Sequence, residues 1–424
     1  MMNHFSYGTY FRFTLFGGSH EPLLGVEIQG IPADTAFDEA ALKAFLARRA
    51  PGQGRFASPR RETDIPVFEK GLAGSRFTGD TVRAVLYNRD ARPSDYEEIR
   101  HIPRPGHADY PAYARCGEIP AGGGYYSGRM TAAFCIAGGI ARQLLEKEGI
   151  RVEARILSVG GVPAEEEKAL QAALEDARAR GDSLGGVIQC RVTGLPVGLG
   201  DHPFGGLENR LAQVVFAIPG AKGLAFGDGF ALAGMTGSRA NDGYRWENGR
   251  VRLTSNHAGG LLGGMATGAP LVFQVAFKPT PSIGLAQESV DLESGENVTL
   301  SVPGRHDVCY ALRAVPVVEA AAAAALYDAW LESRAMQGRD LQAGRQRIDA
   351  ADRQIKEAFL ERMEAAEIIG AYKKEQGLPV YDPAREAELL RRITSSGSEG
   401  SPQRQEALRT LYETILQISR DSQV

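Results

Sequence analysis

Residues 373–390 read KKEQGLPVYDPAREAELL, a charged stretch that fits two helices separated by one break. The break is Gly-Leu-Pro at 377–379, because glycine and proline both interrupt helices. Asp382 followed by Pro383 indicates a new helix start, since Asp caps the first turn and Pro fits its first position. Most of the 51 glycines lie before residue 325, so this stretch belongs to a region of different composition from the rest of the chain.

Residues 341–424, which surround this stretch, fit an all-α domain of three helices. In the first helix, apolar residues recur at helical spacing at Ile348, Ile355, Phe359, Met363, Ala366 and Ile369. SSGSEGSP (395–402) is typical of a linker, and residues 403–420 fit the third helix. The change in composition predicts a first domain over 1–334, a linker over 335–340 and a second domain over 341–424.

Before residue 335 the chain alternates short apolar runs with loops rich in Gly and Pro. The clearest runs are VEIQGI (26–31), VRAVLY (82–87), VIQCRV (187–192) and LVFQVAF (271–277). We predict helices over 38–48, 129–148, 164–180, 204–216 and 315–334. The mixture of short strands and helices predicts an α+β domain.

The bulk composition narrows the classes of function. A net charge of −4 argues against non-specific nucleic-acid binding, and the partners expected are small molecules. The four cysteines form no CxxC pair, so we expect no metal site and a reducing, cytoplasmic location. The N-terminus lacks the pattern of a signal peptide. VPVVEAAAAAALYDAW (315–330) contains Glu319, so we expect a buried helix there and no membrane association.

Several loops of the first domain carry residues suited to chemistry. Three hold ionisable groups: LFGGSHEP (15–22), RPGHADY (104–110) and GRHD (304–307). Two are rich in arginine, RRAPGQGRF (48–56) and SPRRETD (58–64), and three in glycine or hydroxyls, AGGGYYSGR (121–129), NHAGGLLGGMATG (256–268) and KPTPS (278–282). Each has a plainer interpretation, because a lone His is more often structural and an arginine cluster is often a solvated surface.

The order of these loops resembles chorismate synthase over about residues 6–333. The resemblance implies a β-α-β sandwich, a homotetramer and reduced FMN (FMNH2) as cofactor. It also implies anti-1,4-elimination of phosphate from 5-enolpyruvylshikimate 3-phosphate, which gives chorismate. That chemistry needs an acid at the leaving phosphate, an anion cradle and an electron-donating flavin. Whether NADPH on this chain or a separate flavin reductase reduces the flavin stays open.

The resemblance also assigns roles to residues. His20 would be the acid near the phosphate, His107 would protonate the reduced flavin, and Asp307 would act with flavin N5 on the C6 hydrogen. The substrate anions would be held by Arg49, Arg55, Arg104, Arg129 and Arg313. Arg49 and Arg55 would also meet NADPH if the chain reduces its own flavin. The FMN contacts would come from Ser127, Arg239, Ala240, Gly264, Lys278, Pro279, Thr280, Pro281, Ser282 and Arg305.

The sequence departs from the family pattern at a few positions. The common GESHG reads GGSHE, which moves the acidic residue from position 18 to Glu21. Tyr125 and Tyr126 stand where many members have Arg-Ser, and Val308 replaces a Pro. These changes put the detail of flavin and substrate affinity in question.

The charged residues of the tail follow a pattern of their own. On one helix, Arg362 and Lys373 lie about 20° apart, whereas Arg345 is turned by about 100° and cannot easily serve the same pocket. Salt bridging on a solvated helix would explain such charges equally well. The order nevertheless resembles the all-helical chorismate mutase domain over 341–424, an intertwined dimer in which each site borrows one arginine from the partner.

By this second resemblance, substrate carboxylates would be bound by Arg345 (from the partner), Arg362 and Arg385. Lys373 and Gln423 would face the ether oxygen of chorismate, which gains negative charge as its bond breaks. Asp382, Glu386 and Ser419 would hold the ring hydroxyl and neighbouring groups. A pericyclic rearrangement needs only a compact conformer and charge stabilisation, which fits a site of cations and amides.

We therefore predict a bifunctional enzyme that converts 5-enolpyruvylshikimate 3-phosphate to chorismate and then to prephenate. The mutase domains would pair as dimers inside the tetramer. Two alternatives remain at this point. The tail could be a sensor that binds chorismate, prephenate or an aromatic amino acid, and the large domain could be a remnant that binds without turnover.

Overall fold

The computed structural model describes residues 5–52, 56, 62–89, 99–302, 307–337, 341–395 and 402–423. The chain divides into two compact units, and the boundary along the chain falls between Gly344 and Arg345. Arg55 and Arg305 lie outside the described residues.

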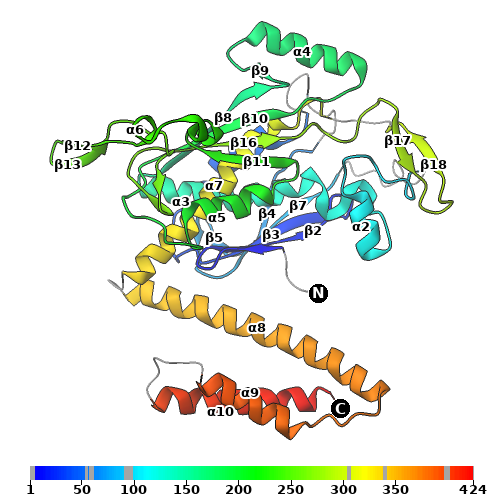
Figure 1. Ribbon diagram of the computed structural model, residues 1–424, viewed down its shortest axis with the longest axis vertical. Helices are drawn as coiled ribbons and strands as arrows, with labels where there is room; N and C mark the ends of the chain where they lie inside the picture. Colours follow the sequence, from blue (N-terminus) through cyan, green and yellow to red (C-terminus); the bar gives the residue numbers. More distant parts are fainter. Residues whose placement is uncertain are drawn as a thin grey trace. The chain divides into compact units, whose positions relative to one another are not determined.

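Two antiparallel sheets form the outer layers of the first unit (Figure 1). The first sheet has the strand order β1-β2-β3-β7-β4 and contains β1 (Ser6–Tyr7), β2 (Arg12–Gly17), β3 (Leu23–Gln29), β4 (Val67–Lys70) and β7 (Val82–Tyr87). The second has the order β11-β16-β10-β8-β9 and contains β8 (Arg151–Val159), β9 (Val162–Pro163), β10 (Gly186–Thr193), β11 (Ala221–Phe226) and β16 (Leu271–Phe277). In β16, fully buried residues alternate with more exposed ones, as expected for a strand that faces a core on one side.

Helices fill the space between the sheets. They are α1 (Glu39–Arg49), α3 (Thr131–Lys147), α5 (Leu207–Phe216) and α7 (Ala311–Met336). Helix α3 packs against β3 and β7 of the first sheet, α7 packs against β8 and β10 of the second, and the two helices pack against each other. A Cβ at Gly138 would lie 2.3 Å from the Cβ of Ala320, so small residues set this close approach. The result is a β-α-β sandwich.

Helix α7 is the centre of the sandwich. It is long and apolar enough to cross a membrane, yet nearly all of it is buried inside the fold, so it is a core helix. Its Asp328 is 2% exposed, and Oδ1 accepts the backbone N–H groups of Thr9, Tyr10 and Phe11 at 2.9, 2.7 and 2.8 Å. These hydrogen bonds tie the last helix of the domain to the start of its first sheet.

Shorter elements complete the first unit. The further helices are α2 (Asp109–Cys116), α4 (Glu167–Arg180) and α6 (Gly237–Ala240). The 3-10 turns are η2 (Ala121–Tyr126), η3 (Gly128–Met130) and η4 (Gly229–Gly234). The paired strands are β5 (Leu72–Ala73) with β6 (Arg76–Phe77), β12 (Tyr244–Glu247) with β13 (Arg250–Leu253), β14 (Leu261–Leu262) with β15 (Met265–Ala266), and β17 (Gln287–Val290) with β18 (Asn297–Leu300). Figure 1 shows α6 and the β12–β13 hairpin on the opposite side of the sandwich from α2 and the β17–β18 hairpin.

The second unit consists of α8 (Leu341–Glu375), α9 (Pro383–Ser395) and α10 (Pro402–Asp421). Helix α8 ends at Gly377, whose φ of 64° allows the Leu378 N–H to donate to the Lys373 carbonyl at 2.8 Å. Helix α9 is capped by Asp382, whose carboxylate accepts the Arg385 N–H at 3.0 Å. Both features confirm the break and the capping residue predicted from the sequence.

The five helices predicted in the first domain are present as α1, α3, α4, α5 and α7, and the strands β7 and β16 match the runs VRAVLY and LVFQVAF. Helix α2 was not predicted, because it has only eight residues, carries Pro111 in its first turn and ends at Gly117. Helix α7 continues to Met336, just past the domain end predicted at residue 334, and α8 begins at Leu341.

Candidate active sites

Two histidines predicted to be catalytic lie against consecutive glycines of η2. A Cβ at Gly122 would lie 1.8 Å from His20 Cε1, and a Cβ at Gly123 would lie 2.7 Å from His107 Cε1. Both glycines also have positive φ, 58° and 88°. The AGGGYY turn therefore provides the space that each imidazole ring occupies, and it brings together residues far apart in the sequence.

His20 follows strand β2 in a tight turn. The hydroxyl of the fully buried Ser19 lies 2.9 Å from His20 Nδ1, so it orients the ring. A side chain at Gly18 would meet Glu21, because a Cβ there would lie 2.9 Å from Glu21 Oε1. The side chain of Glu21 thus fills the space beside position 18, where the resemblance implied an acidic residue.

The loop that holds His107 packs against the KPTPS loop. Arg104 is 6% exposed, and its Nη1 donates to Ser282 Oγ at 3.3 Å. Lys278 Nζ donates to the Gly106 carbonyl. Two of the predicted motifs therefore form one continuous wall, in which Arg104 and Lys278 already have partners.

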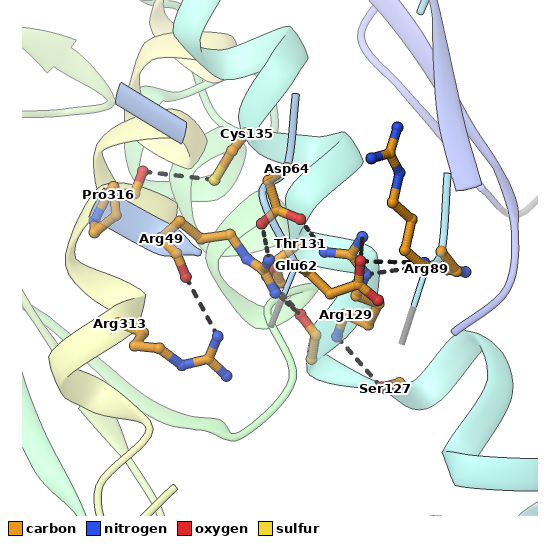
Figure 2. Close-up of polar contacts among 12 residues, drawn as sticks. Arg49, Glu62, Asp64, Arg89, Ser127, Arg129, Thr131, Cys135, Arg313 and Pro316 are labelled. Carbon is orange, nitrogen blue, oxygen red and sulfur yellow. Dashed lines mark hydrogen bonds and ion pairs between the residues drawn. The ribbon is translucent and has the colours of Figure 1, made fainter. Parts of the chain in front are cut away.

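A buried cluster of opposite charges lies beside η3 (Figure 2). Asp64 is 4% exposed and lies between two guanidinium groups, with Arg49 Nη1 at 2.5 Å from Oδ2 and Arg129 Nη1 on Oδ1. Glu62 Oε2 lies 3.9 Å from Arg129 Nη2. Arg49 also donates to Thr131 Oγ1 at 3.2 Å and to a backbone carbonyl of η3. All of its side-chain nitrogens are therefore engaged.

The charges in this cluster balance each other. Burial alone would raise the pKa of Asp64, but the charges of Arg49 and Arg129 hold it below its usual range. Burial lowers the pKa of Arg129, and Asp64 acts against that shift. Arg129 Nη2 is buried and donates no hydrogen bond to any of the described residues. It is the nitrogen of the cluster best placed to donate to a bound anion.

The third predicted catalytic residue lies at the start of α7. Asp307 is 8% exposed, and Arg313 Nη2 donates to its Oδ2 at 2.5 Å. Arg313 Nη1 also donates to the Arg49 carbonyl at 3.3 Å, which links Asp307 to the buried cluster. The structure thus brings Arg49, Arg129, Asp307 and Arg313 into one network.

Other predicted contacts are placed separately. Ser127 Oγ accepts the Arg129 N–H at 3.3 Å and caps η3. Arg239 and Ala240 belong to α6, which Figure 1 shows far from α2 and the loop before it. Gly264 packs on the Asp201 carbonyl, where its Cβ would lie at 2.2 Å. Arg239 and Ala240 therefore do not join the loop of His107 within one chain.

The second unit has its own set of side chains. Arg362 Nη1 donates to Ser419 Oγ, and Lys373 Nζ donates to the Val380 carbonyl at 2.7 Å. Gln423 packs on Gly370, where a Cβ would lie 2.9 Å from Gln423 Cγ, and its Oε1 is buried with no hydrogen-bond partner among the described residues.

Around these residues, Glu386 accepts Arg420 Nη1 at 2.6 Å, and Arg385 pairs with Glu388 at 3.1 Å. Asp382 caps α9. Arg345 is exposed and makes no contact with the other predicted residues among those described. The ends of all three helices thus supply cations, an amide and a carboxylate from one unit, apart from Arg345.

Comparison with known proteins identifies both units. A family model described as chorismate synthase matches residues 11–331. The chain belongs to the chorismate synthase family. A second model, chorismate mutase type II, matches residues 344–424. The chain is therefore a bifunctional shikimate-pathway enzyme, a chorismate synthase followed by a chorismate mutase domain.

The relatives support the first assignment along nearly their whole length. The chorismate synthase of Thermococcus gammatolerans is 44% identical over 352 residues, covering 78% of this chain and 99% of that protein. The chorismate synthase of Aeropyrum pernix is 42% identical over 362 residues, covering 79% of this chain and 95% of that protein. A crystal structure of chorismate synthase aligns with a TM-score of 0.59 at 22% identity, covering 82% of this chain and 99% of that one, and it shows the same fold.

The chorismate synthase family uses reduced FMN, and the residues of this chain fit that group. The Thr280 hydroxyl in the KPTPS loop is buried without a hydrogen-bond partner among the described residues, beside Lys278 and Ser282. A hydroxyl in that state is suited to a polar ligand.

Sequence reasoning missed the acidic partners in the synthase domain and one basic partner in the mutase domain. Asp64, Glu62 and Asp109 were inside quoted motifs but received no role, and Arg420 was overlooked. The available signal was electrostatic: several arginines inside one fold require buried carboxylates to balance them.

Proposed function

We propose that the synthase domain carries out the full elimination on 5-enolpyruvylshikimate 3-phosphate, with His20, His107 and Asp307 as its catalytic residues. The observation that carries this is the placement of His20 and His107 on adjacent glycines of one turn. A structural histidine does not require a glycine with positive φ to make room for it. Two such arrangements side by side are expected of a site in which both rings must reach one substrate.

Each group has a role suited to its surroundings. His20, oriented by Ser19, donates a proton to the leaving phosphate oxygen. Asp307 is a carboxylate paired with Arg313 and acts at the C6 hydrogen of the substrate. Arg129 and Arg313 hold the substrate anions. Arg55 of the predicted set and Arg305, which was predicted to contact FMN, lie outside the described residues. Arg49 acts through the cluster, since its nitrogens are engaged inside the fold.

Reduced FMN, when bound, supplies electron density to the substrate and is not consumed overall. We assign Lys278, Pro279, Thr280, Pro281 and Ser282 to its binding, together with Ser127. Helix α6, with Arg239 and Ala240, lies apart from α2 in Figure 1, so we propose that these two residues, together with Gly264, reach the flavin of a neighbouring subunit in a homotetramer.

The engagement of Arg49 inside the fold argues against it as an NADPH ligand, and we propose that a separate reductase supplies the reduced flavin. Consumption of NADPH by the purified chain with oxidised FMN, measured anaerobically, would contradict this. The proposal of a separate reductase would be supported if the chain consumed no NADPH but turned over fully once FMN had been reduced chemically.

The test of the synthase assignment is an anaerobic assay with chemically reduced FMN. Wild type should release phosphate, and His107→Ala should release it roughly 100-fold more slowly, or more slowly still. His202→Ala is the matched control, because His202 is exposed and paired only with its neighbour Asp201. Equal activity of the two variants would refute the role of His107.

We also propose that the mutase domain turns over chorismate to prephenate. Gln423 carries the argument, because its buried oxygen has no protein partner among the described residues and lies among the ends of three helices. Lys373 and Gln423 stabilise the charge on the ether oxygen, and Arg362 and Arg385 hold the carboxylates. Asp382, Glu386 and Ser419 contact the ring hydroxyl side of the substrate.

The mutase domains are proposed to pair as dimers. Helix α8 exposes large apolar side chains that a monomer would normally bury, with Ile348 at 61%, Ile355 at 59% and Ile368 at 72% exposure. A second copy of α8 would cover Ile348 and Ile355 together with Ile369, which is 51% exposed on the same face of the helix. Pairing would also bring the exposed Arg345 to the site of the partner subunit.

Complementation tests the mutase site and its pairing together. Arg345→Ala and Lys373→Ala should each abolish turnover of added chorismate. Hybrids assembled from the two variants should regain activity, because one of their two sites then has both residues. Failure of the hybrids would exclude the shared arginine. Binding of chorismate by wild type without any turnover would instead support the sensor alternative.

All four cysteines, which lie within the described residues, carry free thiols, and we propose a cytoplasmic location on that basis. We place the boundary between the catalytic domains in residues 335–340, from the last residues of the core helix α7 to the start of α8. Proteolysis that releases two stable fragments cut within this segment would support the boundary.

A further inference from the structure

The carboxylate of Asp109 is the centre of a dense network in the synthase site. Asp109 is the first residue of α2 and is 1% exposed. Its Oδ2 accepts the Arg104 N–H at 3.1 Å and Arg104 Nε at 2.7 Å. Its Oδ1 accepts Arg104 Nη2 at 2.9 Å and lies 2.5 Å from His107 Nδ1. Four polar contacts thus converge on one buried carboxylate.

The chemistry of this carboxylate determines where the proton of His107 lies. Burial alone would raise the pKa of Asp109, but hydrogen bonds from His107 and Arg104 outweigh burial and hold that pKa below its usual range. At neutral pH Asp109 is therefore only an acceptor, and the contact with His107 requires a hydrogen on Nδ1. Neutral His107 consequently keeps the lone pair on Nε2.

The opposite edge of the His107 ring faces the glycine turn. A Cβ at Gly123 would lie 2.7 Å from Cε1 and 3.0 Å from Nε2 of His107. The adjacent Gly122 makes the same kind of contact with His20. The nitrogen left free by Asp109 is thus the one directed to the turn where the two predicted catalytic histidines meet.

Each side-chain nitrogen of Arg104 has a partner within this network. Its Nε and Nη2 bind Asp109, its Nη1 binds Ser282, and Nη2 also lies 3.1 Å from His107 Nδ1. The contact of His107 Nδ1 with Asp109 is shorter, at 2.5 Å, so the carboxylate sets the position of the ring proton. The guanidinium group spans the carboxylate and fixes the start of α2 against the KPTPS loop. This differs from the role of substrate ligand expected from the sequence.

We propose that Asp109 is the positioning residue of the synthase site, which fixes His107 in the Nδ1–H tautomer with Nε2 toward the glycine turn. Arg104 holds Asp109 in place and does not bind the substrate. The inference rests on the proposed role of His107 as a catalytic residue of the synthase site, where Nε2 must take up a proton before it can donate one.

The decisive variant is Asp109→Asn, which keeps the shape but replaces an obligate acceptor with an amide. The amide N–H donates to Nδ1, which moves the histidine proton to Nε2. Histidine ¹⁵N NMR on the flavin-free full-length chain reads the tautomer directly. Wild type should show His107 protonated at Nδ1, and Asp109→Asn should show it protonated at Nε2. Wild-type His107 protonated at Nε2 would overturn the proposal whether or not the variant folds.

Turnover supplies the second readout. Asp109→Asn should lower kcat of the synthase roughly 10- to 100-fold, as expected for the orienting partner of a functional histidine, with little change in KM. The double variant Asp109→Asn/His107→Ala should have the same synthase kcat as His107→Ala alone. A further loss, or a change in KM alone, would refute a role through His107.

Glu293→Gln is the matched control. His101 Nε2 lies 3.3 Å from Glu293 Oε2 in an exposed pair, so this variant also removes a carboxylate from a histidine. It should leave synthase activity and the His107 signals unchanged, and a change in either would overturn the specificity claimed for Asp109. If wild type releases no phosphate, the proposed function fails, while the NMR result still decides the tautomer.

Discussion

Substitution of Gly122 by alanine tests whether the glycine turn positions His20. The added Cβ would lie 1.8 Å from His20 Cε1, whereas an ordinary contact between carbon atoms is 3.5–4.0 Å. The ring must therefore move by roughly 2 Å. A displacement of about 1 Å at a reacting group can lower the reaction rate about 10²-fold. We therefore expect Gly122→Ala to lower synthase kcat at least ~100-fold.

The backbone cost of this substitution needs a control of its own. Gly122 has φ of 58°, where alanine costs about 1–2 kcal/mol. Gly74 has φ of 61°, and a Cβ there meets no described atom within 4 Å. Gly74→Ala therefore carries the same strain without the collision and should keep nearly full activity.

The assay is anaerobic phosphate release with reduced FMN, with turnover of added chorismate measured on the same samples. Mutase turnover should be unchanged in both variants, which shows that the protein was recovered intact. If Gly122→Ala retains the synthase activity of Gly74→Ala, the glycine turn does not position His20 and the assignment of the site is wrong.

A thiol reagent at pH 8 should modify Cys116 alone in the native protein, because burial raises the pKa of the other three thiols, and peptide mass spectrometry would reveal any early reaction at a buried one. Arg420→Ala should raise KM for chorismate by roughly 3- to 10-fold, because it frees Glu386 from an ion pair of 2.6 Å. Steady-state mutase kinetics measure this, with the exposed Arg409→Ala as a neutral control. The lowered pKa of Asp109 means that its contribution to stability is complete above about pH 4 and is lost as the pH falls. Calorimetry should therefore show that Tm falls more steeply between pH 5 and 3 for wild type than for Asp109→Asn. Parallel curves of Tm against pH for the two proteins would contradict this contribution of Asp109.

The fold could largely be predicted from local patterns. The run LVFQVAF predicts a strand by its alternation, and the structure confirms β16 with the same ends. The alanine-rich run predicts a buried helix, which is α7. Asp382 predicts a cap from its position before Pro383, and the capping hydrogen bond is present. These features depend on neighbours within a few residues, which a sequence shows directly.

The candidate sites could be predicted only in part. The residues were found by their order along the chain, but their contacts depend on distances between segments that a sequence does not contain. The sequence predicts that the glycine-rich loop AGGGYYSGR is suited to chemistry, but it does not show that Gly122 lies against His20. Arg104 was expected to bind substrate, whereas its guanidinium is bound to Asp109. An arginine in a loop has the same appearance in sequence whether it meets a ligand or a buried acid.

The three hydrogen bonds accepted by Asp328 have a consequence for synthesis of the chain. Thr9 to Phe11 leave the ribosome first, but their partner on α7 follows more than three hundred residues later. Long separations of this kind slow folding, because the loop must close before the contact forms. The sandwich therefore cannot be completed until translation has reached the mutase region, whose helices rely on contacts close in sequence. We expect the order of synthesis and the order of folding to differ for the two enzymes of this chain.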